Sequence, residues 1–283
     1  MSFTVKRKIA NLLDRLGGRR LLSAAATHWA RSLTGDQDLS IIYDDMWIDV
    51  IDQTYIPRSS TFNYYALDFK NMRDLARDRL SASLDYWTHV YCPQIGDTVI
   101  DVGAGIGIDT LALSPLVGPG GRIYSIEAHP WTFRALLRTC ELNRLPNVSP
   151  LQYALSNKPG QLWISDLPNN EDNYVSKAFL NDHAISVPAT NLDTLVDSLG
   201  ICRIALLKMN IEGAEQMVIN GVDRCIDQID HVAIACHDFR GDGFRTRQPV
   251  IAFLRDHGFD IIERRDDPRP YVRDHIHGIR KRS

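Results

Sequence analysis

With 283 residues, of which 44% are hydrophobic and 24% charged, the chain has the length and composition of one large globular domain with an added segment. A net charge of −3 gives no general attraction to nucleic acid, so we expect no nucleic-acid partner. There is no signal-peptide pattern and no apolar run near the roughly 20 residues that span a bilayer. The five cysteines are scattered and form no metal or disulfide motif, which together with the missing leader predicts a cytoplasmic protein.

The first 33 residues predict a basic amphipathic helix that is interrupted at Gly17 and Gly18. Apolar side chains recur at helical spacing at Ile9, Leu12, Leu13 and Leu16. Such a helix can cover its own domain, contact a second subunit in a homo-oligomer, or dock peripherally on a membrane surface. The sequence favours packing against protein.

The next segment leads into the main domain. Residues 36–70 are mixed in character, and their aromatic-rich part, residues 61–66, is expected to form a short strand or a lid on the substrate side. A helical period then predicts a helix over residues 71–91. We therefore divide the chain into an N-terminal helical extension, residues 1–92, with a possible lid or oligomer contact, and a main α/β domain, residues 93–283.

A buried strand, a glycine-rich turn and the start of a helix follow one another in residues 98–113. The polar and small residues of this stretch are Asp101, Gly103, Ala104, Gly105 and Gly107. Glycine allows the backbone to take a positive φ and to approach a ligand closely, and the N–H groups at a helix start suit a polar or anionic group. The turn is therefore a predicted ligand site.

The spacing of the glycines narrows the class of ligand. The dinucleotide fingerprint Gly-x-Gly-x-x-Gly fails, because its third glycine would fall at Ile108. Twenty residues after Gly107, a second apolar strand over residues 122–126 ends in Glu127. A carboxylate at a strand end can accept hydrogen bonds from both hydroxyls of a ribose, so a nucleoside without a pyrophosphate fits both observations.

Strands and helices alternate beyond this point, which predicts a mainly parallel, doubly wound sheet with helices on both faces. The further expected strands are 148–155, 161–165, 203–211, 231–236 and 260–263, and residues 185–190 are expected to lead into a short helix. The further expected helices are 131–143, a short one after residue 191, 213–221 and 246–257. Residues 166–183 are polar and predict a surface loop, and the C-terminal tail predicts a strand near Tyr271 with disorder after Gly278.

Three blocks carry a family resemblance: DVGAGIG at 101–107, IEAHP at 126–130 and LKMNIEGAE at 207–215. In this order they resemble the FkbM-type S-adenosylmethionine-dependent methyltransferases, over roughly residues 96–262. The resemblance implies a Rossmann-like class I methyltransferase fold with S-adenosylmethionine as cofactor. It implies cofactor contacts from Asp101, Gly103, Ala104, Gly105, Gly107, Glu127, Ala128 and Ala154.

The ends of the later strands carry the residues expected to do the chemistry. His237 is the expected general base, because an imidazole titrates near neutral pH; a structural role is its alternative. Asn210 stands where the family usually has aspartate, and an amide can orient a hydroxyl but can neither take its proton nor supply an anionic metal ligand. Asn210, Glu212 and His237 are the expected acceptor contacts, and no metal is expected. Lys208 is expected to pair with a carboxylate, and Glu215 to cap or pair.

The resemblance and these residues predict an O-methyltransferase that acts on a hydroxyl of a sugar, glycolipid or polyketide-like metabolite. The partner would be a small-molecule or glycan acceptor. Methylation of a carboxyl or amide nitrogen of a peptide-like substrate is one alternative. Because Asn210 replaces aspartate, a cofactor-binding subunit without catalysis is another.

Overall fold

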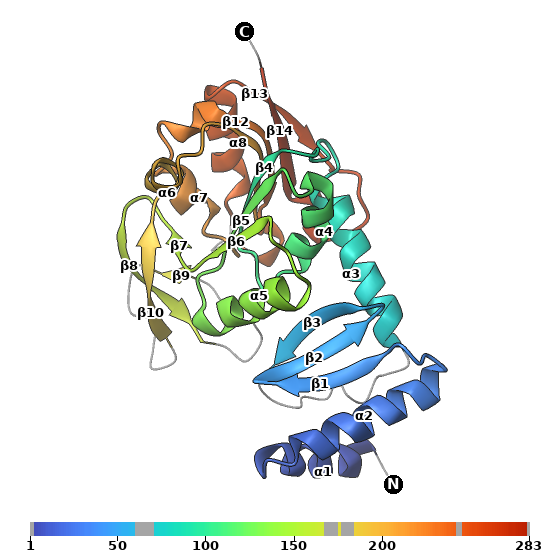
Figure 1. Ribbon diagram of the computed structural model, residues 1–283. Coiled ribbons are helices and arrows are strands. Elements are labelled where there is room, and N and C mark those ends of the chain that lie inside the picture. The colour runs from blue at the N-terminus through green and yellow to red at the C-terminus, as the bar shows by residue number, and fades with distance from the viewer. Residues whose placement is uncertain (1–2, 60–70, 167–174, 177–183, 242–244, 282–283) are drawn as a thin grey trace.

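Two helices and a small sheet form the N-terminal part of the molecule. The computed structural model describes residues 3–59, 71–166, 175–176, 184–241 and 245–281 (Figure 1). The helices are α1 (Phe3–Arg15) and α2 (Arg19–Thr34), separated at the predicted break. The antiparallel strands are β1 (Ser40–Asp44), β2 (Met46–Ile51) and β3 (Thr54–Ser59). The prediction of a helical extension is therefore incomplete, because the N-terminal part also contains this sheet.

The small sheet lies between α2 and α5 (Pro130–Leu142), and both of its faces are buried (Figure 1). Ala26 and Ala30, one helical turn apart, are buried in the cluster between α2 and the sheet, and Ile48 on the opposite face packs with Ala135. The N-terminal helices thus cover their own domain. Leu16 and other leucines remain exposed, so contacts with a second subunit or a membrane stay predictions. In the described part of the chain, no helix is long and apolar enough to cross a membrane.

Seven strands form the central sheet, in the order β13-β14-β12-β11-β4-β5-β6. They are β4 (Thr98–Val102), β5 (Arg122–Ile126), β6 (Val148–Leu151), β11 (Ile204–Met209), β12 (Ile229–Ala235), β13 (Phe259–Glu263) and β14 (His275–Arg280). The pairs from β12 across β11, β4 and β5 to β6 are parallel, and β14 is antiparallel to both of its neighbours. The predicted mainly parallel sheet is confirmed.

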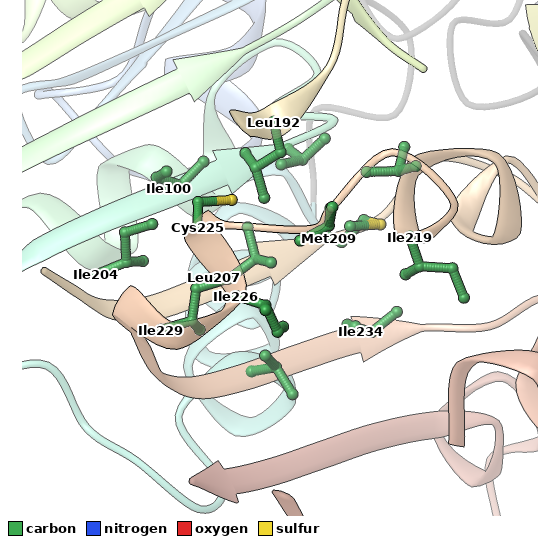
Figure 2. Packing of buried hydrophobic residues seen from close by; sticks show 14 of the residues in the cluster. Ile100, Leu192, Ile204, Leu207, Met209, Ile219, Cys225, Ile226, Ile229 and Ile234 are labelled. Carbon is green, nitrogen blue, oxygen red and sulfur yellow. The ribbon is translucent and has the colours of Figure 1, made fainter. Parts of the chain in front are cut away.

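Helices cover both faces of this sheet, as a doubly wound fold requires. On one face lie α3 (Met72–Trp87), α4 (Ile108–Val117) and α5; on the other lie α6 (Leu192–Leu199), α7 (Glu215–Ile219) and α8 (Arg247–Asp256). Neighbouring residues alternate between the two cores: Val99 packs with the first set, whereas Ile100 packs with the second. Figure 2 shows the second core, where Ile100, Leu207 and Ile234 of three neighbouring strands pack with helix residues such as Leu192 of α6 and Ile219 of α7.

A second sheet has the order β7-β10-β8-β9. Its strands are β7 (Ala154–Leu155), β8 (Gly160–Ser165), β9 (Val175–Ser176) and β10 (Ala184–Thr190). The single strand expected over 148–155 is wrong, because β6 pairs with β5 whereas β7 pairs with β10. Pro150 lacks an N–H and fits β6 because this strand is at the edge of the central sheet.

Two expectations for loops are affected by this second sheet. Residues 175–176 form β9, so the expected surface loop over 166–183 is wrong at these two positions. The aromatic stretch 61–66, an expected strand or lid, lies outside the described residues.

The C-terminal tail differs from expectation. Residues around Tyr271 form the helix α9 (Pro270–Arg273), and the chain continues after Gly278 as the strand β14 to Arg280, which is inserted between β12 and β13. Gly278 suits this place: a Cβ there would lie 2.8 Å from Cγ2 of Val232. The insertion depends on this close approach between distant segments, which has no local signal in the sequence.

Candidate functional site

A cavity of about 590 Å³ lies at the carboxyl ends of β4, β5 and β11. The predicted residues that line it are Gly103, Ala104, Gly105, Glu127, Ala128, Ala154, Asn210 and Glu212. The carboxyl edge of a parallel sheet is where such folds bind ligands. Asp101, Gly107 and His237 are predicted for the site as well, but they do not line the cavity.

Each glycine of the turn after β4 has a different role. Gly103, with φ 72°, runs so close to β11 that a Cβ would stand 1.9 Å from the carbonyl oxygen of Asn210. At Gly105, with φ 58°, a Cβ would meet no atom within 4 Å, so its surroundings are open. Gly107 precedes α4 and packs near Leu136 of α5. The turn therefore presents backbone to the cavity at Gly105 and packs against protein at its two ends.

Glu127 is held in a fixed orientation at the end of β5. Its Oε2 accepts a hydrogen bond from the Gly105 N–H at 3.0 Å, and its Oε1 accepts one from the His129 N–H at 2.9 Å. Burial raises the pKa of Glu127, although both N–H groups favour the carboxylate. Each oxygen keeps a second lone pair, so the carboxylate can also accept hydrogen bonds from two ligand hydroxyls.

Beneath the turn, Lys208 is completely buried and pairs with two carboxylates, as predicted. Its Nζ lies 2.8 Å from Oδ1 of Asp101 and 2.9 Å from Oδ2 of Asp109, and it donates a hydrogen bond to the Gly103 carbonyl at 3.0 Å. Burial lowers the pKa of Lys208, but the two carboxylates outweigh this effect and raise it. Lys208 is thus a cation that fixes the backbone of the turn.

Asp101 helps to hold Lys208 beneath the turn and does not line the cavity. Its carboxylate is completely buried, paired with Lys208, and accepts a hydrogen bond from Oγ1 of Thr110 at 2.9 Å. The predicted direct contact between Asp101 and the cofactor does not fit this arrangement, because the side chain points away from the cavity into the α4 interface. Asp109 instead lines the cavity, where Oγ of Ser83 donates to it at 2.5 Å.

Asn210 and Glu212 follow β11 and line the cavity. The amide oxygen Oδ1 of Asn210 is buried and has no hydrogen-bond partner in the described part of the chain. A buried acceptor of this kind is costly unless a ligand satisfies it. Glu212 has an unusual positive φ of 54°, and its carboxylate contacts Nη1 of Arg240 and, at 3.3 Å, Nε2 of His237.

His237 lies behind Glu212 and is itself buried. Its Nε2 faces Glu212, and its Nδ1 lies 3.2 Å from Oε1 of Glu215. Burial lowers the pKa of His237, but the two carboxylates outweigh it and raise the pKa to about 9. The predicted role of general base does not fit, because the ring is protonated at neutral pH and is shielded from the cavity. Glu215 pairs as expected, with His237 and with the Thr246 hydroxyl at 2.8 Å.

Several lining residues are not among those that the sequence predicts for the site. Arg58 of β3 and Arg79 of α3 come from the N-terminal part, and Tyr153 precedes the predicted Ala154. Neither arginine lies in a glycine-rich turn or at the end of a central strand, which are the local patterns that mark such a site, whereas Tyr153 follows the end of β6 and could have been found by that pattern. Only the packing of α3 over the central sheet and of the small sheet against α5 brings the two arginines to the cavity.

The fold and the site together define a nucleoside-binding α/β protein of the class I methyltransferase type. Residues 101–261 match the family model described as the methyltransferase FkbM domain. The chain therefore belongs to the FkbM methyltransferase family, and S-adenosylmethionine is its cofactor. The site fits this cofactor, because open space at Gly105 adjoins the fixed carboxylate of Glu127.

Two relatives of known sequence are similar over most of the domain. Methyltransferase 1 of Beauveria bassiana is 28% identical over 193 residues, which are 61% of this chain and 76% of the relative. The 31-O-demethyl-FK506 methyltransferase FkbM of Streptomyces tacrolimicus is 26% identical over 251 residues, which are 77% of this chain and 92% of the relative.

More distant matches extend the comparison. The hexuronic acid methyltransferase AglP of Haloferax volcanii is 26% identical over 144 residues, 50% of this chain and 56% of the relative. A solved structure of methyltransferase FkbM from Methylobacillus flagellatus is 14% identical, with a TM-score of 0.47, over 77% of this chain and 55% of that chain.

Proposed function

We propose that the protein transfers the methyl group of S-adenosylmethionine to a hydroxyl oxygen of a sugar, glycolipid or polyketide-like acceptor. The observation that carries this proposal is the buried, unpartnered Oδ1 of Asn210 in the cavity wall, within the part of the chain that the structure describes. An amide oxygen accepts a hydrogen bond from a hydroxyl, which would fix the direction of the lone pairs of the acceptor oxygen. The activities named for the FkbM and AglP relatives support an oxygenated acceptor.

Different residues of the chain would bind the cofactor and the acceptor. Glu127 and the turn at Gly105 hold the nucleoside portion of the cofactor, which when bound supplies an electrophilic methyl group. Asn210 holds the acceptor oxygen on the opposite side of the turn. Methyl transfer is an in-line displacement, so correct placement of the oxygen supplies several kcal/mol toward the barrier.

The hydroxyl must also lose its proton. Because an alcohol oxygen becomes strongly acidic as its new bond to carbon forms, a weak carboxylate base is sufficient. We assign this role to Glu212, whose carboxylate lines the cavity two residues after Asn210. His237 and Arg240 are positioning residues that hold this carboxylate.

The test is single-turnover transfer from labelled S-adenosylmethionine to a panel of hydroxylated sugars and polyketides, with mass spectrometry of the product. We expect Asn210→Ala to lower the transfer rate by about 10- to 100-fold, the scale of a lost orienting hydrogen bond to a reacting group, while S-adenosylhomocysteine affinity stays within about twofold. The matched control is Asn220→Ala, which removes the same amide from an exposed position at the end of α7, outside the cavity lining. This control should transfer the methyl group at the wild-type rate.

Treatment of the product with mild alkali separates the alternatives. A methyl ether survives, whereas a methyl ester of a carboxyl acceptor is hydrolysed; a methylated amide nitrogen is located by fragmentation. An alkali-labile product or an N-methylated one would contradict the hydroxyl acceptor. Tight S-adenosylhomocysteine binding without turnover on the hydroxyl, carboxyl or amide panels would favour a non-catalytic subunit.

A further inference from the structure

Two arginines from the N-terminal part form a cationic edge of the cavity. Arg58 of β3 and Arg79 of α3 both line it. Nε of Arg58 donates to Oδ2 of Asp49 at 2.8 Å, and the exposed fractions of these two side chains are 9% and 6%. Burial raises the pKa of Asp49, whereas the charges of both arginines act to lower it. The two guanidinium groups therefore act on the same buried carboxylate.

Arg79 differs from the other ionised groups of the cavity wall. Asp109 is paired with Lys208, and Glu212 is paired with Arg240. Arg79 forms no hydrogen bond or ion pair with any residue that the structure describes. A partly buried guanidinium whose N–H donors meet no acceptor among the described residues loses hydration that the more distant charge of Asp49 does not replace, so the edge near Arg79 suits a negatively charged ligand group.

The position of the two arginines in the chain indicates which ligand supplies the anion. The glycine-rich turn and Glu127 lie inside residues 101–261, the part that matches the family model. Arg58 and Arg79 lie outside it, on elements that this chain packs over the site. The cofactor is shared by the family, whereas the acceptor differs between the named relatives, so residues outside the shared part are suited to acceptor choice.

We propose that Arg79, supported by Arg58 and Asp49, binds an anionic group of the acceptor, a carboxylate or a phosphate. The inference rests on the proposed function, because it assumes that an acceptor enters this cavity. A guanidinium can donate two hydrogen bonds side by side to two oxygens of either group. The acceptor class thereby narrows to acidic hydroxylated molecules, such as a uronic acid or a sugar phosphate.

The proposal can be tested without turnover by measuring how acceptor-like probes bind to the protein loaded with S-adenosylhomocysteine. The probes are D-glucuronate and D-glucose 6-phosphate, each compared with uncharged D-glucose at constant ionic strength by calorimetry or saturation-transfer NMR. We expect at least one anionic probe to bind more tightly than glucose, and Arg79→Gln to weaken it by at least about tenfold, the scale of a charge-assisted hydrogen bond. Arg79→Lys should retain part of the affinity.

The matched control is Arg77→Gln, which removes the same charge from the same helix. Arg77 pairs with Asp52 at the surface and does not line the cavity, so its removal should leave probe binding unchanged. Equal effects of the two variants, or no preference for either anionic probe over glucose, would overturn the proposal.

A second arm identifies the source of the anion. S-adenosylhomocysteine has its own carboxylate, and 5′-methylthioadenosine lacks it. We expect Arg79→Gln to leave the affinity for both nucleosides within about twofold. A loss confined to S-adenosylhomocysteine would assign Arg79 to the cofactor and overturn the acceptor site. Failure of the wild-type protein to bind either nucleoside would instead contradict the proposed function itself.

Discussion

Gly103 and Asn210 are in backbone contact: a Cβ on Gly103 would stand 1.9 Å from the carbonyl oxygen of Asn210. The turn that would hold the cofactor and the strand end that would hold the acceptor are thus fixed against each other. Asn210 N–H also donates to the Val102 carbonyl at 2.9 Å, which continues the pairing of β4 with β11 to this point. The relative placement of the two ligands therefore depends on one close backbone approach.

Substitution of Gly103 by alanine should separate the two strand ends. We expect Gly103→Ala to lower the free energy of unfolding by about 1–3 kcal/mol, the cost of overpacking and of a forced positive φ. S-adenosylhomocysteine affinity should fall by about tenfold or more in calorimetry, because the turn must move. Gly200→Ala is the control: Gly200 caps α6 at φ 64° with nothing within 4 Å of a Cβ, so only stability should change. Unchanged nucleoside affinity in Gly103→Ala would contradict this account.

Removal of the Glu127 charge should weaken cofactor binding. Glu127→Gln keeps an amide oxygen for one backbone N–H but loses the charge that would strengthen the expected hydrogen bonds from the ribose hydroxyls. We expect S-adenosylhomocysteine binding to weaken by about 1.5–3 kcal/mol in calorimetry. Glu141→Gln, an exposed position on α5, should bind normally. Equal affinities for the two variants would remove Glu127 from the site.

His237 should make the protein less stable as the pH rises. Its pKa is raised to about 9 in the folded protein from the ordinary value of 6.5, so its stabilising effect is complete below pH 6.5 and is lost as the pH rises through 9. We expect chemical denaturation to show up to about 3 kcal/mol of this loss in the wild type. The loss should be absent in His237→Gln and retained in His28→Gln, an exposed control.

The kinetic effect of His237→Gln distinguishes positioning from base catalysis. If His237 only holds Glu212, the rate of methyl transfer should fall by less than about tenfold, whereas loss of a general base costs about 10²–10⁴-fold. The pH–rate profiles of the wild type and of His237→Gln should also show the same ionisations, because the imidazole takes no proton from the acceptor. A fall of about 10²-fold or more with unchanged nucleoside affinity would return His237 to the role of base.

Two histidines of β14 should make the protein sensitive to acid. Burial lowers the pKa of His275 to about 3 and that of His277 to about 4, so both are neutral in the folded protein. Stability that is present above pH 6.5, the ordinary histidine pKa, should fall as the pH decreases toward 4, because the unfolded chain binds these protons first. His275→Phe, which keeps an aromatic ring against Trp87, should reduce the acid sensitivity of unfolding. An unchanged pH dependence would argue that these rings are hydrated.

Local features of the site could be predicted from the sequence by itself. Gly105 and Glu127 are recognisable because a strand, a tight turn and a helix start are short-range patterns, and because strand ends in a parallel sheet meet at one edge. The doubly wound sheet follows from the alternation of elements for the same reason. The pairing of Lys208 is predictable as well, since a lysine in an apolar strand requires a carboxylate.

The tertiary structure decided everything that depends on partners far away in the sequence. Asp101 lies below the cavity because Lys208, from a neighbouring strand, draws its carboxylate inward. His237 is protonated because two carboxylates of another segment enclose it. Arg79 reaches the cavity because α3 packs over the central sheet, and no residue pattern around it records that packing. The periodicity and spacing of residues indicate the local geometry of the backbone. Burial and charge pairing depend on contacts between distant segments, which exist only in the folded chain.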